Sequence, residues 1–279
     1  MYMQIPDHWL TAFNVGLIMA LKKEPTPDPV PADYIPPCRP IVMGGLGQAV
    51  LSKAAEKVRH GSIVNSLQPL QLGLSKGGVE LMVLGIEEML HAFREHGLIV
   101  AAVDMANMFN ALQHGGPNGV FEEIDKRQLI RDLIPVYLAL YRFGTLLFGK
   151  QKDGLLKQIV RGEVGMRQGN QLSTTGACIA THRLVADADE IVKLGNNPGM
   201  CRAYADNAYI IGTPENVFKA VDYITEQQKI RLGVDNNPRE SYVYIPPNVS
   251  DEQAALATRL ATARDFNVSR AGIKVLGVY

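Results

Sequence analysis

Two apolar stretches in the middle of the chain each carry an aspartate where a strand is expected to end. Residues 98–110, LIVAAVDMANMFN, form an apolar run that is interrupted by Asp104. Residues 201–212, CRAYADNAYIIG, form two short apolar segments joined by Asp206-Asn207, with the aromatic and β-branched residues typical of strands. Because Asp-Asn suits a two-residue hairpin turn, we predict a strand that ends on Asp104 and a hairpin with Asp206 in its turn.

Helical periodicity, helix caps and glycine or proline breaks predict the secondary structure of most of the remaining chain. They predict helices at residues 9–22, 79–96, 173–193, 214–231 and 250–264. The third of these helices is expected to be capped by Ser173 or Thr174. Strands, helices and a central hairpin alternate irregularly, which favours an α+β fold with an antiparallel sheet backed by helices. In such a sheet the two aspartates can meet.

The sequence of residues 145–168 predicts a second hairpin, which carries many basic side chains. A basic hairpin is most often a solvated surface, and beside a metal site it could also contact phosphates. Its cationic side chains are Lys150, Lys152, Lys157, Arg161 and Arg167. A proline-dense stretch within residues 25–40 is expected to be extended or looped.

Charge and cysteine content narrow the class of protein. The 279 residues carry 28 basic and 28 acidic side chains, and this balance argues mildly against tight, stand-alone binding of nucleic acid. Cys38, Cys178 and Cys201 are few and far apart, which indicates reduced thiols in an intracellular protein without zinc-ligand spacing. The apolar stretch at residues 13–21 is too short to span a bilayer. We therefore expect a soluble intracellular protein with no membrane partner, and the sequence does not distinguish nucleus from cytoplasm.

The aspartates admit two interpretations when they are considered alone. Asp206 by itself is more often only a turn residue. A carboxylate at the end of a buried strand is costly unless a cation pairs with it, and two such carboxylates provide a plausible seat for a divalent metal. A separate alternative is a dinucleotide-binding βαβ unit, because a strand, Gly45-Leu46-Gly47 and a helix follow one another near residue 45. Val50 replaces the third glycine of that fingerprint.

Seven segments carry a resemblance to a known family. They are RPIVMGGLGQAVLSKAAEKV, LQLGLSKGGVELMVLGI, VDMANMFNAL, GMRQGNQLSTTGA, YADNAYIIG, LGVDNNPRESYVY and VLGVY. In this order they resemble two fingers segments, motifs A, B, C and D, and the start of the primer grip (motif E) of the reverse transcriptase domain of LINE-type (non-LTR) retroelements. The resemblance runs from about residue 21 to residue 279. It implies a right-hand polymerase with palm and fingers.

The resemblance also implies a domain arrangement. Fingers would occupy residues 1–98, with the proline-rich stretch at 25–40, and the motif A strand of the palm would occupy residues 99–111. A connection between fingers and palm, with the basic hairpin, would occupy residues 112–170. The palm would resume at residues 171–279 with the end of motif B and motifs C, D and E. Because the chain ends where the family's thumb begins, the thumb is expected to be missing, and another chain could supply a thumb or an endonuclease.

The family's chemistry is two-metal nucleotidyl transfer, so the resemblance implies Mg²⁺ (or Mn²⁺) and a substrate set of RNA template, DNA primer and dNTP. Asp104 and Asp206 would be the catalytic metal ligands. The residues implied to contact dNTP or template are Arg39, Phe109, Gln168, Gly169 and Asn207, with weaker candidates Lys22, Lys23 and Arg239. Phe109 would obstruct a 2′-hydroxyl, and Gly169 would allow close backbone approach. Taken alone, Phe109 is better explained as core and Arg39 as an exposed charge.

Departures from the family pattern leave two functional hypotheses. Asn207 replaces the second acid of motif C, and Asn170-Gln171 replaces the Asp-Pro of motif B. Arg239 and Glu240 fall where motif D has a lysine. The chain is therefore expected to be either an RNA-directed DNA polymerase, impaired by Asn207 and the missing thumb, or an inactive retroelement remnant that binds only nucleic acid or protein. The dinucleotide-binding oxidoreductase is a distant third hypothesis.

Overall fold

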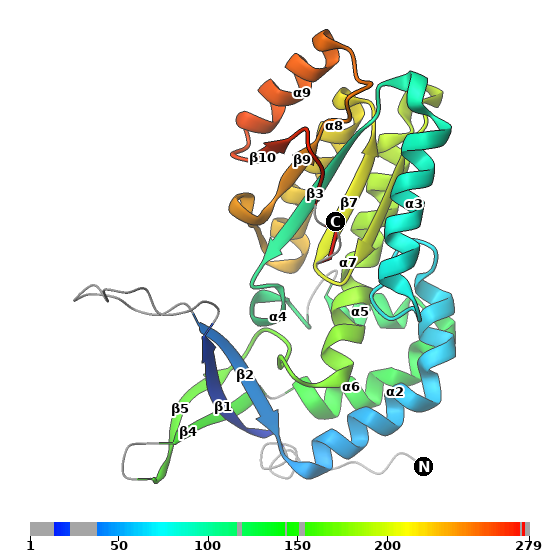
Figure 1. Ribbon diagram of the computed structural model, residues 1–279. Helices are drawn as coiled ribbons and strands as arrows, with labels where there is room; N and C mark the ends of the chain where they lie inside the picture. The colour runs from blue at the N-terminus through cyan, green and yellow to red at the C-terminus, as the bar shows by residue number, and fades with distance from the viewer. Residues whose placement is uncertain are drawn as a thin grey trace, which may run out of the picture.

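The computed structural model describes residues 14–22, 38–115, 119–142, 144–150, 154–273 and 275–276. These residues form two sheets with helices around them (Figure 1). The larger sheet, which we call the palm sheet, has the strand order β10-β9-β3-β7-β6, and β8 pairs with β3 beside this path. Its strands are β3 (Ile99–Ala106), β6 (Met200–Tyr204), β7 (Asn207–Gly212), β8 (Asp235–Asn236), β9 (Tyr242–Tyr244) and β10 (Asn267–Ser269). All pairs are antiparallel except β9 with β10.

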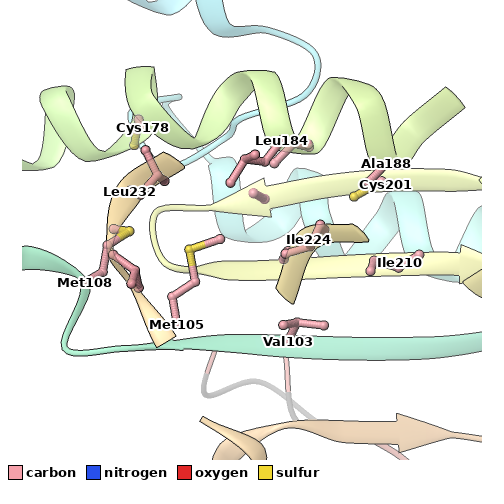
Figure 2. Close-up of a cluster of buried hydrophobic side chains, with 14 of the residues drawn as sticks. Val103, Met105, Met108, Cys178, Leu184, Ala188, Cys201, Ile210, Ile224 and Leu232 are labelled. Carbon is pink, nitrogen blue, oxygen red and sulfur yellow. The ribbon is translucent and has the colours of Figure 1, made fainter. Parts of the chain in front are cut away.

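Helices cover both faces of the palm sheet because its central strands are apolar on both sides. On one face, α7 (Gln171–Val192) and α8 (Pro214–Gln227) pack against alternate residues of β3 and β7, and α9 (Asp251–Thr262) packs on α8. Figure 2 shows Val103, Met105 and Ile210 of the sheet facing Leu184 and Ala188 of α7. This arrangement confirms the expected α+β fold, an antiparallel sheet backed by helices.

On the other face, α3 (Gly78–Ala92) contributes Met82 and Ile86 to a second buried cluster with Val100 and Ile211. The helix predicted at residues 79–96 is confirmed, with a 3₁₀ turn at Arg94–His96 as its last part. No helix in the described part of the chain combines the length and the apolar character needed to cross a membrane.

The smaller sheet, the fingers sheet, has the strand order β2-β1-β4-β5. Its strands are β1 (Val15–Lys22), β2 (Cys38–Gly44), β4 (Thr145–Lys150) and β5 (Leu156–Gly162). The hairpin predicted at residues 145–168 is confirmed as β4 and β5, and it ends at Gly162 rather than at residue 168. The helices between the two sheets are α2 (Leu46–Leu67), α4 (Met108–Ala111), α5 (Val120–Asp125) and α6 (Ile134–Tyr141), with a 3₁₀ helix at Gln128–Leu133.

The helix predicted at residues 9–22 is wrong for residues 15–22, which form β1. A short apolar run does not distinguish a strand from a helix, and pairing with other strands overrides local propensity here. β1 pairs antiparallel with β2 and parallel with β4, so it is an inner strand of the fingers sheet. Residues 9–13 and most of the proline-dense stretch lie outside the described residues.

The glycine turn at residues 45–47 does not open a βαβ unit. Gly45 precedes the first residue of α2, and the next regular element along the chain is the helix α3. A dinucleotide-binding unit needs a parallel strand after the first helix. The order β2-α2-α3 therefore contradicts the dinucleotide hypothesis.

Arg167 is buried at the junction of fingers and palm, although the sequence grouped it with the solvated basic hairpin. Its Nε donates to Thr145 Oγ1 (3.0 Å), its Nη1 donates to Gln48 Oε1, and its Nη2 donates to Asn14 Oδ1 (2.9 Å) and to the Leu140 carbonyl. The guanidinium also lies 5.0 Å from the ring centroid of Tyr141. Burial lowers the pKa of Arg167. One side chain thus connects α2, β4, α6 and the residue that precedes β1.

Candidate active site

The palm sheet brings Asp104 and Asp206 together. Asp104 on β3 pairs with Asn207 on β7, so Asp206, one residue earlier, lies beside the end of β3. The backbone N–H of Met105 donates to the carbonyl of Asp206 over 3.2 Å. Both aspartates line one hollow of about 110 Å³, which we call the acidic hollow. The juxtaposition expected from the two apolar stretches is present.

The hairpin turn lies one residue earlier than predicted. Tyr204 pairs with Asn207, so the two turn residues are Ala205 and Asp206, and Asn207 is the first residue of β7. Ala205 has a left-handed backbone with φ of 52°. An alanine in this region costs about 1–3 kcal/mol, which the surrounding structure must offset. The carboxylate of Asp206 therefore projects from a strained turn.

Asp104 is held by backbone and side-chain hydrogen bonds from the segment before β9. Its N–H donates to Ser241 Oγ (3.1 Å), and its carbonyl accepts from the N–H of Asn237 (2.9 Å). The Asn237 side-chain amide donates to Asp104 Oδ2 (2.9 Å). Ser241 is fully buried, and its Oγ donates to the Asn237 carbonyl (2.8 Å). These contacts fix both the strand end and the direction of the Asp104 carboxylate.

The lining of the acidic hollow is rich in oxygen atoms. It contains the carboxylates of Asp104, Asp206 and Glu240, and the amides of asparagines and Gln168. The asparagines are Asn107, Asn110 and Asn237, and the other residues that line the hollow are Met105, Met108 and Phe109. Asn207 Nδ2 donates to Asp206 Oδ1 over 3.3 Å.

The negative charge of these carboxylates contributes to raised pKa values of two neighbouring groups. Burial raises the pKa of Tyr209 to about 12, and the charges of Asp104 and Asp206 act in the same direction. Burial likewise raises the pKa of the Cys178 thiol to about 12, with a further contribution from Asp206. A negative potential in a small polar hollow favours a bound cation.

The donor set fits Mg²⁺ or Mn²⁺ rather than a softer metal that prefers thiolate or imidazole ligands. Carboxylate oxygens are the ligands of hard divalent cations, and Mg²⁺ is commonly bound through one or two carboxylates plus substrate phosphates. Across the described residues, no group of three or more His, Cys, Asp and Glu side chains could hold a metal by itself. The remaining ligands would then come from substrate and water.

The predicted substrate-contacting residues fall at different distances from this point. Phe109 and Gln168 line the acidic hollow, and Asn207 lines an adjoining hollow of about 540 Å³ that also reaches Asp104. Phe109 is half-buried and packs against the core as well. A core role and a substrate-contacting role are therefore compatible for this side chain. Arg239 is exposed beside Glu240, and it does not line the acidic hollow.

The other predicted cations belong to the first two strands. In the β1–β2 ladder Arg39 pairs with Leu21, and Lys22 pairs with Cys38. Lys23 lies outside the described residues.

Gln168 and Gly169 connect the acidic hollow to the fingers sheet. The carbonyl of Gln168 accepts from the N–H of Val42 on β2 over 3.1 Å. Gly169 has φ of 111°, a conformation that favours glycine, and it lines a hollow of about 420 Å³ together with β2. The next residue, Asn170, caps α7 by accepting from the Leu172 N–H (2.9 Å). The cap predicted at Ser173 or Thr174 is therefore wrong by three residues or more.

Sequence reasoning missed two residues that support the aspartates, Asn237 and Gln71. Asn237 carries no local signal, because it contacts Asp104 across 133 positions of the chain. Gln71 is 1% exposed and hydrogen-bonds to the Ala205–Asp206 turn. A glutamine in an apolar segment was the available signal, since a buried amide requires partners.

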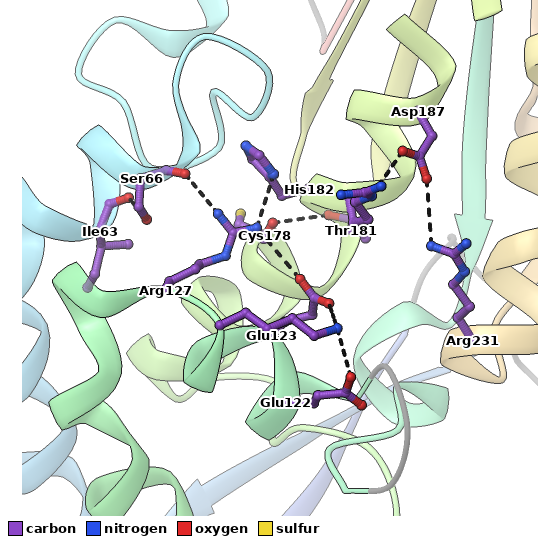
Figure 3. Close-up of polar contacts among 12 residues, drawn as sticks. Ile63, Ser66, Glu122, Glu123, Arg127, Cys178, Thr181, His182, Asp187 and Arg231 are labelled. Carbon is purple, nitrogen blue, oxygen red and sulfur yellow. Dashed lines mark hydrogen bonds and ion pairs between the residues drawn. The ribbon is translucent and has the colours of Figure 1, made fainter. Parts of the chain in front are cut away.

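A second polar cluster lies where α5, α7 and the end of α2 meet (Figure 3). Arg127 Nη1 donates to the Ser66 carbonyl (2.9 Å), and Arg127 Nη2 lies 3.0 Å from His182 Nδ1. Because arginine can only donate, His182 Nδ1 must accept, and the imidazole is neutral. Burial lowers the pKa of His182 to about 4, and the charge of Arg127 adds to this effect.

Acid is expected to destabilise the protein through His182. The unfolded chain binds a proton near pH 6.5 and the folded chain only near pH 4, so the free energy of unfolding falls by about 2–3 kcal/mol across that window. A His182→Gln variant, which can still accept from Arg127, should lose this contribution. Urea unfolding at pH 7 and pH 4.5 measures it. His91→Gln, an exposed site on α3, is the control and should keep the wild-type pH dependence.

Comparison with known proteins relates the fold to telomerase. No protein-family model and no curated protein matches the sequence. Among solved structures, apo telomerase from Candida tropicalis matches with a TM-score of 0.58 and 12% identity, over 87% of this chain and 46% of that chain. A form truncated from the C-terminal domain gives 0.57 and 14%, over 83% and 50%.

Telomerase from Candida albicans in complex with the TWJ fragment of telomeric RNA gives a TM-score of 0.54 and 13% identity, over 86% of this chain and 43% of that chain. The chain spans about half the length of the telomerase chains that it matches. At this identity the likeness establishes a shared fold, and it confirms the expected α+β architecture of palm and fingers.

Proposed function

We propose that this chain is a reverse transcriptase domain of the LINE type, an RNA-directed DNA polymerase that extends a DNA primer by nucleotidyl transfer. The observation that carries the proposal is the pair of aspartates, Asp104 and Asp206, that line one acidic hollow at the end of the palm strands. The telomerase likeness supports it, because telomerase structures of the same fold include one with telomeric RNA.

In the proposed reaction the primer 3′-oxygen attacks the α-phosphorus of a dNTP. A phosphorus–oxygen bond forms, the bond to pyrophosphate breaks, and the hydroxyl proton leaves to solvent. Magnesium held by Asp104 and Asp206 would activate the hydroxyl and offset the triphosphate charge. Asn237 and Ser241 keep the Asp104 carboxylate and its strand end in place for that role.

The substrate residues take the roles that the sequence resemblance implies. Phe109, at the rim of the acidic hollow, would lie under the sugar and exclude a 2′-hydroxyl. Gln168 and Gly169 would line the nascent base pair where their backbone meets β2. The triphosphate would be neutralised from the fingers by Arg39, with Lys22, Lys23 and Arg239 as weaker candidates.

Primer extension on an RNA template tests the proposal. Purified chain is mixed with an annealed DNA primer, dNTPs and either Mg²⁺ or Mn²⁺, and Asp104→Asn is run in parallel. The proposal predicts extension by the wild type that is lost in the variant. Absence of extension with both metals would contradict the proposed activity.

A second candidate function, a non-catalytic remnant that binds nucleic acid, is favoured by one residue. Asn207 offers the site an amide where the family has an acid, and its Nδ2 is directed to Asp206. The two candidate functions predict different results when a carboxylate is restored at position 207.

Asn207→Asp is expected to raise the rate of Mg²⁺-dependent primer extension by about tenfold, because a carboxylate adds charge beside the metal ligands. Asn207→Ala, which removes the amide without adding charge, is the matched control and should not show the gain. An Asn207→Asp variant that folds and remains without extension would favour the remnant.

A further inference from the structure

Gln71 lies between the fingers segment and the turn that carries Asp206, and its side-chain amide is fully committed. Oε1 accepts from the N–H of Ala205 (2.9 Å) and from the N–H of Gly73 (3.0 Å). Nε2 donates to the carbonyl of Ala205 (3.2 Å) and to Thr181 Oγ1 (3.2 Å). A primary amide has two acceptor and two donor sites, so each site of Gln71 has a partner.

These bonds engage both backbone polar groups of Ala205, the residue with φ of 52° that precedes Asp206. A non-glycine residue in this conformation persists only where its surroundings over-determine it. Gln71 is 1% exposed, so no water competes for its four hydrogen bonds. The amide therefore supplies a restraint that the hairpin sequence itself does not contain.

Backbone hydrogen bonds and close packing fix the position of Gln71. Leu72 N–H donates to the Ala203 carbonyl (2.7 Å), and Ala203 N–H donates to the Leu70 carbonyl (2.8 Å), so this segment runs along β6. A Cβ at Gly73 would lie 2.7 Å from the Ala205 nitrogen. On the far side, Thr181 of α7 is fully buried and donates to the Ala177 carbonyl (2.9 Å).

We propose that Gln71 is a positioning residue that holds the Ala205–Asp206 turn and thereby sets the location of the Asp206 carboxylate. The proposal rests on the proposed function insofar as Asp206 binds metal. Gln71 couples three elements to that carboxylate: the segment before α3, the α7 helix and the β6–β7 hairpin. Loss of the amide would remove its hydrogen bonds to both backbone polar groups of Ala205 and would release the turn.

The test replaces Gln71 with methionine, which has a similar length and no hydrogen-bonding amide. Gln228→Met is the matched control: Gln228 is also fully buried, and its side-chain amide atoms have no hydrogen-bond partner in the described part of the chain. Both variants make the same chemical change inside the palm. Only the first touches the Ala205–Asp206 turn.

Two readouts are compared with the wild type. The first is the amide hydrogen exchange of Ala205 and Gly73, which is expected to accelerate at least tenfold in Gln71→Met and to be unchanged in Gln228→Met. The second is the dissociation constant for Mn²⁺, measured by the EPR signal of the free ion. It is expected to rise about 10–100-fold in Gln71→Met, as for other residues that orient metal ligands.

The two readouts separate failure of the proposal from failure of the proposed function. Wild-type chain that binds no Mn²⁺ would contradict the metal site, and the exchange of the Ala205 amide would then decide alone whether Gln71 holds the turn. Unchanged exchange and unchanged Mn²⁺ affinity in folded Gln71→Met would overturn the proposal. Should Gln71→Met not fold, Thr181→Val, which removes one partner of the amide, is expected to show the same changes at smaller size, and wild-type values in it would overturn the proposal.

Discussion

Asp206→Asn is expected to lower primer extension by about a thousandfold or more, while the free energy of unfolding rises by roughly 0.5–1 kcal/mol. The loss of activity follows from removing a charged ligand for the metal. The gain in stability follows because Asp206 shares a small hollow with Asp104 and Glu240, and the like charges repel. Opposite signs for activity and stability are the signature of a functional rather than a structural carboxylate.

Extension assays and urea unfolding, carried out on the same preparations, check both parts of this prediction. Asp235→Asn is the control, since Asp235 is an exposed residue of β8 that pairs with Lys229 on the surface. It should change neither quantity appreciably. An Asp206→Asn variant that is strongly destabilised would show instead that the carboxylate serves the fold.

Arg167→Met is expected to reduce the free energy of unfolding by about 3–5 kcal/mol, the largest effect on stability that we predict. The substitution keeps apolar volume beside Tyr141 and removes the hydrogen bonds that the guanidinium donates to Asn14, Gln48, Thr145 and Leu140. Because these acceptors come from α2, β4, α6 and the residue that precedes β1, the packing of the fingers sheet should suffer first.

Urea unfolding followed by far-UV circular dichroism measures the effect of Arg167→Met. Arg131→Met is a suitable control, because Arg131 is exposed and pairs with the exposed Asp125. The control is expected to stay within about 0.5 kcal/mol of the wild type. Equal losses in the two variants would contradict the role given to the buried guanidinium.

The sequence pattern predicts the central palm strands and the β4–β5 hairpin of the fingers sheet, and it does not predict β1. β3 and the β6–β7 hairpin are apolar segments with a local turn, and this pattern indicates that Asp104 and Asp206 can meet. It places Asn207 in the turn, whereas Asn207 is the strand residue that pairs with Asp104. The local pattern predicts a helix where β1 forms. The strands that pair with β1 lie about 20 and 130 residues away in the chain. Nothing in an eight-residue apolar run records such distant pairing.

The candidate site shows the same division between local and distant information. The two aspartates could be identified because an acid in an apolar strand is conspicuous by itself. Asn237 and Gln71 could not be assigned, since each acts through hydrogen bonds across more than 130 residues. Asn170 was identified only as a departure from the family pattern, yet it caps α7 and donates to Ser52.

The most direct test of Asp104 and Asp206 as metal ligands is a Mn²⁺ titration followed by EPR, with the wild type, Asp104→Asn and Asp206→Asn compared in the presence of a dNTP. We expect saturable binding by the wild type and binding at least a hundredfold weaker in each variant. Binding of equal strength in all three proteins, or none in the folded wild type, would contradict the assignment of Asp104 and Asp206 as metal ligands.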